Sequence, residues 1–336
     1  MSSGVKTFLQ YLFIFSLTIL LIWVSLRGLQ GENKWEYLKG AWTNADKGWL
    51  LLMAAVAIAS HVVRALRWRM LMEPAGHHSK LSHSFYSLMV GYLVNLVVPR
   101  GGEVSRCYNL YKLNQTPVEV SFGTVVLERI VDVICLLVLI VISFAVEYKK
   151  LIDFIETLPF GEATGGSKSG IIAIVIGAIL LVLLVAFLII RRNEKIKQFI
   201  RKTWNGFKEG LLSVFKLEQK KLFIFYSVLI WALYFLMSYT VIMAFEATSV
   251  LGWSAVLSLF AIGAIAMAAP LPGGTGSYHV LVPQSLVFLY HVSSADAVAF
   301  TFIFHGWQTL IMILGGAISL ILTSIIIRRK KKALNS

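Results

Sequence analysis

The chain has 336 residues, of which 57% are hydrophobic and only 14% are charged, with a formal net charge of +14. A soluble domain of this length needs a more polar surface, so this composition excludes a soluble globular domain and predicts a polytopic membrane protein. No series of ten-residue segments alternates between apolar and polar residues as in a membrane barrel. The fold class that we expect is therefore all-α.

Six apolar runs are long enough to cross the hydrocarbon core, which takes about 20 helical residues. Two shorter apolar runs, 84–98 and 254–270, each end at a cluster of proline and glycine. We expect these two to turn back within the membrane. The first long run exceeds a typical signal-peptide core, and no small-residue cleavage site follows it, so we expect it to be retained. The six predicted full crossings are 8–26, 49–72, 121–146, 170–190, 222–245 and 297–327.

Basic residues gather in a few segments of the chain. Ten Lys and Arg residues lie in 191–221 and five more form the tail 328–332, but none lies between Lys221 and Arg328. Basic clusters confined to one set of loops indicate membrane topology rather than nucleic-acid binding. We therefore predict that both termini are cytoplasmic, in the inner membrane of a bacterium, and that nucleic acid is not a partner.

A shift of about 172 residues aligns the two halves of the chain, because Gly101 and Gly102 then fall on Gly273 and Gly274. An odd number of crossings per half inverts the second copy, and inverted repeats with broken helices are typical of secondary transporters. The predicted organisation is a first repeat, 1–146, with a cytoplasmic-side re-entrant hairpin at 84–113; an external loop, 147–169; and a second repeat, 170–336, with a cytoplasmic interfacial helix at 193–217, an external-side re-entrant hairpin at 254–290 and a basic tail.

The Pro/Gly segments between the arms of each predicted hairpin have a physical role. Proline removes a backbone donor and glycine permits a sharp reversal. The freed backbone groups cannot face lipid, so they must meet protein, water or substrate. The alternative is that the glycines only allow close helix packing. The predicted turn residues are Pro99, Gly101, Gly102, Pro272, Gly273 and Gly274.

Ionisable residues concentrate in the predicted membrane segments of the first half. Glu128, Arg129 and Asp132 lie within one span, where charges are costly unless they face a cavity or a partner. Arg64 and Arg67 share one side of another span, and guanidinium groups bind phosphate through parallel hydrogen bonds. These charges form either an ion-pair network that pins helices together or a substrate site, and both can hold. The candidate substrate-binding residues are Arg64, Arg67, Arg100, Glu103, Arg106, Glu128, Arg129, Asp132, His279 and His305.

We expect no cofactor and no metal site. Cys107 and Cys135 lie near or within apolar segments and are too few for a metal site without further ligands. The histidine-rich stretch "HHSKLSH" at 77–83 falls in a predicted cytoplasmic loop that has no nearby cysteine or carboxylate partner.

Four motifs together resemble a known family. "PRGGEVSR" at 99–106 is followed by "LERIVD" at 127–132, preceded by "RALRW" at 64–68 and echoed by "PLPGGTG" at 270–276. This pattern resembles the transmembrane region of lysylphosphatidylglycerol synthase, a flippase-like domain also seen in multiple peptide resistance factors, and the similarity covers nearly the whole chain. The resemblance implies movement of lipids or lipid-linked headgroups between leaflets, and two re-entrant helix pairs.

Two departures from that family pattern bear on function. The larger relatives carry a soluble aminoacyl-transferase domain after this region, whereas the present sequence stops at Ser336, so we expect no synthase activity. Many relatives follow the second glycine cluster with an Arg-Glu pair, where Tyr278 and His279 stand in this chain. His305 likewise stands where the last helix of relatives often carries arginine.

The function that we expect is that of a lipid flippase or translocase rather than an enzyme. It would move an anionic phospholipid or a lipid-linked headgroup within its membrane, and a separate headgroup-synthesising enzyme is a candidate partner. Two alternatives stay open, a membrane-embedded phosphatase or glycosyltransferase and a small-ion transporter. An enzyme would need a nucleophile with its base or a carboxylate metal cluster, and an ion transporter favours a narrow polar pore.

Overall fold

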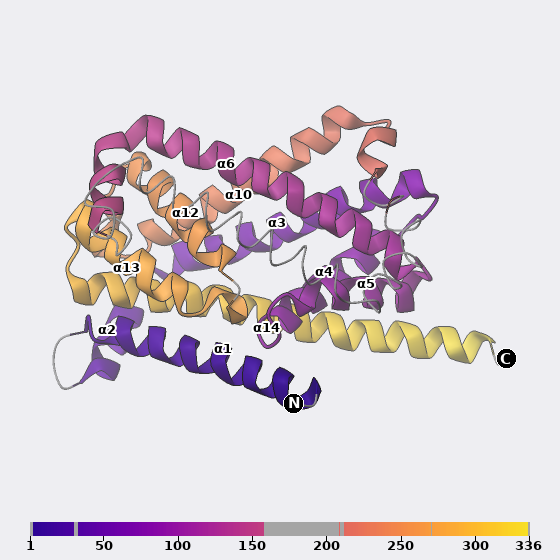
Figure 1. The fold of residues 1–336 in the computed structure, drawn as a ribbon, viewed down its shortest axis with the longest axis horizontal. Coiled ribbons are helices and arrows are strands. Elements are labelled where there is room, and N and C mark those ends of the chain that lie inside the picture. The colour runs from indigo at the N-terminus through magenta and orange to yellow at the C-terminus, as the bar shows by residue number, and fades with distance from the viewer. Residues whose placement is uncertain (1–2, 30–32, 158–207, 209–211, 270, 335–336) are drawn as a thin grey trace.

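The computed structural model confirms the all-helical prediction, because all regular structure in its described part is helical (Figure 1). Among the described residues, four helices are long and apolar enough to cross a membrane, and four of the predicted crossings fall in them. They are α3 (Lys47–Met72), α6 (Val118–Thr157), α10 (Lys220–Met243) and α14 (Ser294–Leu334). The structure describes residues 3–29, 33–157, 208, 212–269 and 271–334.

The two remaining predicted crossings lie in different parts of the chain. The run 8–26 lies within α1 (Ser3–Leu26), a helix of 24 residues. The predicted crossing 170–190 lies outside the described residues. So does most of the predicted interfacial helix 193–217, whose described part contains a single 3₁₀ turn, η2 (Ser213–Lys216).

Two pairs of short helices occupy the positions of the predicted hairpins. The first pair is α4 (Leu81–Asn95) with α5 (Gly101–Asn114), and the second is α12 (Trp253–Ala268) with α13 (Ser277–Tyr290). Helices of 14–16 residues measure roughly 21–24 Å, less than the ~30 Å hydrocarbon core. Figure 1 shows the first pair toward the end of the molecule that carries the C-terminus and the second pair toward the opposite end.

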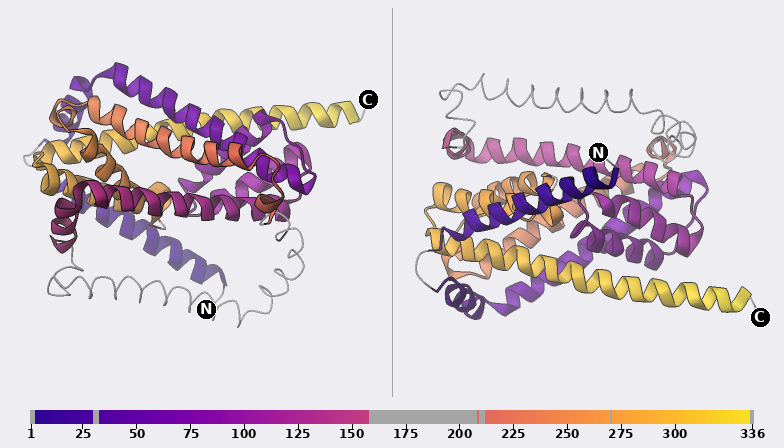
Figure 2. Two further views of the ribbon diagram at one scale, coloured as in Figure 1. Left: turned by 90° about the horizontal axis from the view of Figure 1, so that it is seen from above. Right: turned by 60° about the horizontal axis from the view of Figure 1, so that its bottom comes forward.

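The long helices frame these pairs. Figure 2 shows α3 and α10 side by side along most of their length. The largest hydrophobic cluster joins α3, α10, α12, α13 and α14, with fully buried residues such as Leu50, Val241 and Leu286 at its centre. α1 packs against α13. These apolar contacts therefore hold the second helix pair in place, whereas the polar residues described below hold the first pair.

A short helix that the sequence did not predict, α2 (Lys34–Asn44), packs against α14. The Tyr37 hydroxyl donates a hydrogen bond to Asp296 Oδ1 over 2.7 Å. Partial burial and this carboxylate raise the pKa of Tyr37 to about 12, so the hydroxyl stays protonated at neutral pH. The contact ties the segment after α1 to the start of the last helix.

The first reversal differs in detail from the predicted one. Gly101 and Gly102 lie in the first turn of α5, and the left-handed residue is Arg100, with φ of 62°. Asn95 Oδ1 accepts a hydrogen bond from the Gly102 amide over 2.7 Å and so caps α5. In the second reversal the glycines do take positive φ, 57° at Gly273 and 73° at Gly274, within η3 (Pro272–Gly274).

The physical reason for Gly102 is close helix packing. A Cβ atom at this position would lie 2.1 Å from the backbone oxygen of Gly91 in α4, and one at Gly91 would lie 2.9 Å from the oxygen of Gly102. Neither backbone can move away at low cost, because α4 and α5 are in extensive contact. The two glycines therefore permit the contact between the arms of the first pair.

We expect Gly102→Ala to lower the unfolding temperature of the purified protein, because overpacking against backbone costs about 1–3 kcal/mol. Gly40→Ala is the matched control, since a Cβ atom there meets nothing within 4 Å and alanine favours the helix by roughly 0.5–1 kcal/mol. A thermal unfolding assay in detergent should give opposite signs for the two variants. Equal effects would contradict the packing role of Gly102.

Candidate functional site

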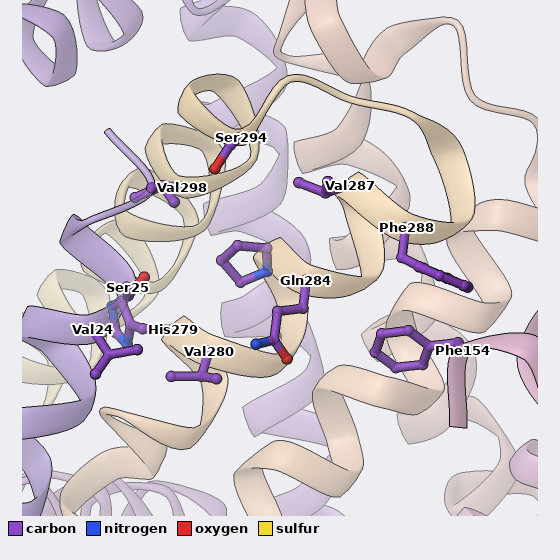
Figure 3. A pocket seen from close by; sticks show the side chains of 12 residues that line it. Val24, Ser25, Phe154, His279, Val280, Gln284, Val287, Phe288, Ser294 and Val298 are labelled. Carbon is purple, nitrogen blue, oxygen red and sulfur yellow. The ribbon is translucent and has the colours of Figure 1, made fainter. Parts of the chain in front are cut away.

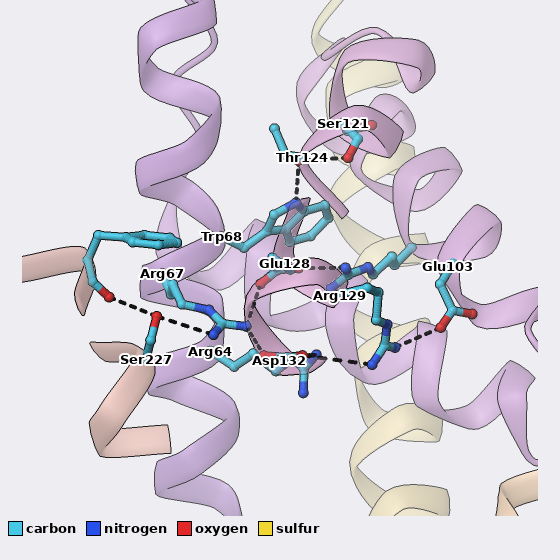
Figure 4. A network of polar contacts seen from close by, with 12 residues as sticks. Arg64, Arg67, Trp68, Glu103, Ser121, Thr124, Glu128, Arg129, Asp132 and Ser227 are labelled. Carbon is cyan, nitrogen blue, oxygen red and sulfur yellow. Dashed lines mark hydrogen bonds and ion pairs between the residues drawn. The ribbon is translucent and has the colours of Figure 1, made fainter. Parts of the chain in front are cut away.

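An arginine–carboxylate network lies between α3, α5 and α6 (Figure 4). Arg64 and Arg67 lie one turn apart on α3, and each donates a hydrogen bond of 2.7 Å to a different oxygen of Asp132 on α6. The spacing of the two arginines, three residues, places both on the same helix side. Asp132 is thus held by two guanidinium groups from one neighbouring helix.

Glu128, one turn before Asp132, is a fully buried member of the network. Its side chain has no solvent exposure, and it accepts a hydrogen bond of 2.5 Å from Arg106 of α5. Arg67, also fully buried, lies 3.5 Å from its other oxygen. The Arg106 guanidinium also lies 4.7 Å above the Trp68 ring. Glu128 therefore joins α3, α5 and α6 at a single point.

The open side of the network is formed by Arg129 and Glu103. Arg129 donates a hydrogen bond of 2.7 Å to Glu103 of α5 and lies 3.9 Å from Asp132. Its side chain is 39% exposed, whereas that of Glu103 is 13% exposed. Arg129 is therefore the arginine of the network that an incoming group could reach first.

The charges of the network do not cancel. Four guanidinium groups face three carboxylates, which leaves a formal charge of +1, and the Nε atoms of all four arginines are buried without a hydrogen-bond partner. Charges in such surroundings are expensive to desolvate, and every unpaired donor adds to the cost. An additional anionic group beside the network would balance this charge. The four arginines are Arg64, Arg67, Arg106 and Arg129.

Arg100 does not belong to this network. Its guanidinium donates a hydrogen bond of 2.9 Å to the backbone oxygen of Ala268, at the end of α12. A Cβ atom on Gly273 would lie 2.9 Å from Leu96 Cδ2, so the two reversals touch at a second point. The tips of the two short helix pairs therefore meet. Glu103, which lies between Arg100 and Arg106 in the sequence, accepts its hydrogen bond from Arg129 instead.

His279 and His305 form a separate cluster in the second half. Their ring centroids lie 4.8 Å apart, and Tyr278 stacks on His305 at 5.3 Å. His305 Nε2 lies 3.0 Å from the backbone oxygen of Gly273, so one histidine holds the second reversal. No contact in the described structure joins these histidines to the arginines of the network.

Two polar residues of α10 that were not predicted also reach the network. Tyr234 of α10 accepts a hydrogen bond of 2.9 Å from Arg64, and Ser227 accepts one of 3.4 Å from Arg67. A hydroxyl in an apolar helix is a weak signal, and only the packing of α10 on α3 brings Tyr234 and Ser227 to the arginines. Beside them, the Trp68 indole of α3 donates a hydrogen bond of 2.9 Å to the Thr124 hydroxyl of α6.

A second buried carboxylate, Glu147, was also missed. The backbone of α6 is non-helical at this residue, with φ of −128° and ψ of 42°, and the helix continues past it to Thr157. The first part of the predicted external loop 147–169 is therefore helical. The Glu147 carboxylate accepts hydrogen bonds from three hydroxyls of the second helix pair, which hold the bend. The donors are Ser254, Ser258 and Tyr290.

Comparison with known proteins agrees with this architecture. Residues 8–316 match the family described as the lysylphosphatidylglycerol synthase TM region. The chain belongs to this family. It is therefore an integral membrane protein, as its composition predicts.

One curated protein to which this chain is similar is UPF0104 membrane protein MJ1595 of Methanocaldococcus jannaschii. The two are 29% identical over 92 residues, which is 26% of this chain and 27% of the relative. The match thus spans about a quarter of the relative's length. No solved structure matches the chain.

Proposed function

We propose that this protein is a lipid translocase that moves an anionic phospholipid or lipid-linked headgroup between leaflets. The observation that carries the proposal is the charge imbalance of the arginine–carboxylate network, together with its four unpaired Nε donors. A phosphate supplies both the negative charge and several acceptor oxygens, and guanidinium groups bind it through parallel hydrogen bonds. Membership of a synthase TM region family agrees with a lipid substrate.

The transport part of the proposal rests on the two short helix pairs. We infer that they are re-entrant hairpins of an inverted repeat, because each is too short to span the core and they lie at opposite ends of the molecule. Their tips meet through Arg100 and Ala268. Movement of one hairpin against the other would open the network alternately to either leaflet.

We further propose that both termini are cytoplasmic, in a bacterial inner membrane. Support comes from the basic clusters of the sequence. On this orientation the α4–α5 pair enters from the cytoplasmic side, where a separate headgroup-synthesising enzyme would deliver substrate. A cysteine placed in α2, such as Trp35→Cys, should then react with an impermeant thiol reagent on intact cells, and failure to react would reverse the orientation.

The transport proposal is tested with the full chain in phosphatidylcholine vesicles that contain fluorescent phosphatidylglycerol or fluorescent phosphatidylcholine. We expect outward movement of the anionic lipid to be at least about tenfold faster than that of the zwitterionic lipid, since one charge-assisted contact is worth about 1.5–3 kcal/mol. Dithionite quenching measures both rates. Equal rates for the two lipids would contradict anion recognition.

The same vesicles separate the alternative functions. Release of inorganic phosphate or of a free headgroup would indicate an enzyme, and an ionic current without lipid movement would indicate a small-ion transporter. Glu128 and Arg67 favour neither alternative, because they are fully buried and paired with each other. An enzyme needs a free nucleophile or base, and an ion transporter favours a narrow polar pore.

A further inference from the structure

A second site lies apart from the arginine–carboxylate network, in a lateral pocket between α1, α13 and α14 (Figure 3). Its volume is about 520 Å³, within the range of 300–1,000 Å³ that is typical of small-molecule sites. Phe154, from the end of α6, lies at one side of it. The pocket contains His279, which the sequence had assigned to the same site as the arginines.

The walls of the pocket are mainly apolar, and part of them is open to the surroundings. Val24 of α1 is 41% exposed, and Val287 and Phe288 of α13 are 37% and 39% exposed. These side chains lie on helices of the membrane region, so the surroundings that they face are lipid. A lipid can therefore place its headgroup in the pocket from the side while its acyl chains stay in the bilayer.

The polar groups of the pocket are uncharged and lack partners. The Ser25 hydroxyl is buried, at 7% residue exposure, and has no hydrogen-bond partner. His279 Nδ1 accepts a hydrogen bond of 3.4 Å from the Gly276 amide, so the neutral ring carries its proton on Nε2. No printed hydrogen bond in the described structure involves that Nε2 or the exposed Gln284 amide. Buried polar groups normally find partners, so the Ser25 hydroxyl is the group that awaits a ligand, with His279 and Gln284 beside it.

The chemistry of the lining selects among lipid headgroups. None of the described residues that line the pocket is Lys, Arg, Asp or Glu, so a phosphate or an ammonium group would be desolvated there without a counter-charge from them. A hydroxyl can instead accept a hydrogen bond from Nε2–H of His279 and donate one to Ser25 or to the Gln284 carbonyl. The groups present therefore match a ligand that both donates and accepts but carries no charge.

We propose that this pocket binds the uncharged, hydroxyl-bearing headgroup of a lipid, either glycerol or a sugar. The proposal does not depend on lipid transport, because a static binding site would need the same groups. It also differs in ligand from the arginine network, where an anion is required. One protein would then distinguish charged from uncharged lipids at two separate places.

The test uses the full chain in phosphatidylcholine nanodiscs with a trace of monoglucosyl diacylglycerol that carries a photoreactive diazirine beside its headgroup. We expect crosslinks, mapped by mass spectrometry, to residues 280–288 and 24–28. Excess unlabelled monoglucosyl diacylglycerol should reduce them at least about tenfold. Phosphatidylglycerol, which has the glycerol hydroxyls and a charge, should not. Equal competition by diacylglycerol would identify glycerol as the recognised group, and weaker competition would identify the sugar.

Variants link the labelling to the pocket. Val280→Trp fills the pocket and should abolish the crosslinks, whereas Val138→Trp, on a 53% exposed position of α6, should leave them unchanged. Gln284→Leu removes an exposed amide, so it should fold normally and still reduce labelling several-fold. Crosslinks that persist in Val280→Trp, or that phosphatidylglycerol displaces as well as the glycolipid does, would overturn the proposal. Neither readout requires transport, so a failed transport assay would not affect it.

Discussion

Glu128→Ala should destabilise the protein by about 3–5 kcal/mol, the usual cost of removing one partner from a buried ion pair. The side chain of Glu128 is completely buried, and its loss would leave Arg106 without a carboxylate and Arg67 with Asp132 alone. Because Glu128 joins α3, α5 and α6, its removal should loosen the first helix pair as a unit. Unfolding of purified protein in a thermal or denaturant series measures the effect.

Glu73→Ala provides the control for this result. Glu73 is 45% exposed and lies 3.8 Å from Arg69, so it forms a surface pair worth about 0–1 kcal/mol. The double variant Glu128→Ala/Arg106→Ala should recover part of the loss, since it also removes the arginine that would be left without a carboxylate. A Glu128→Ala protein as stable as Glu73→Ala would show that the network does not hold the helices together.

Charge pattern and helical spacing were sufficient to predict the members of the network but not their pairing. Arg64 with Arg67, and Glu128 with Asp132, can be placed on common helix faces by counting residues. The partner of Glu103 could not be deduced in this way, because it depends on how α5 lies against α6. The structure pairs it with Arg129, not with the arginines that flank it in sequence.

The two reversals of the backbone could likewise be predicted from the sequence, whereas the bend in α6 could not. Proline and glycine indicated both reversals, and the helix pairs occupy 81–114 and 253–290, close to the predicted bounds 84–113 and 254–290. The bend at Glu147 had no such signal, since neither residue type adjoins it in "FAVEYKK". Three hydroxyls from the second helix pair stabilise it, and these are tertiary contacts. Positive φ at Arg100 is likewise set by contact between the two tips.

The different burial of the four arginines in the network indicates different roles for them. Arg64, Arg67 and Arg106 are at most 6% exposed and closed on carboxylates, so they hold helices and set the local potential. Arg129 is more open, and its partner Glu103 retains a buried oxygen without a hydrogen bond. If the proposed transport is correct, Arg129 is the group that can exchange Glu103 for a phosphate at the smallest structural cost.

We therefore expect Arg129→Ala to lower the rate of anionic-lipid movement roughly ten- to a hundred-fold, which corresponds to the loss of one charge-assisted contact. Its stability should fall less than that of Glu128→Ala, because the Arg129 side chain is 39% exposed whereas Glu128 is fully buried. Arg69→Ala is the matched control: this arginine is 31% exposed and pairs only with Glu73 in the described structure. The measurement is the vesicle transport assay on protein normalised for reconstitution and unfolding temperature. Normal transport by Arg129→Ala would assign the arginines to helix packing alone, and equal loss in Arg69→Ala would remove the link between the network and substrate.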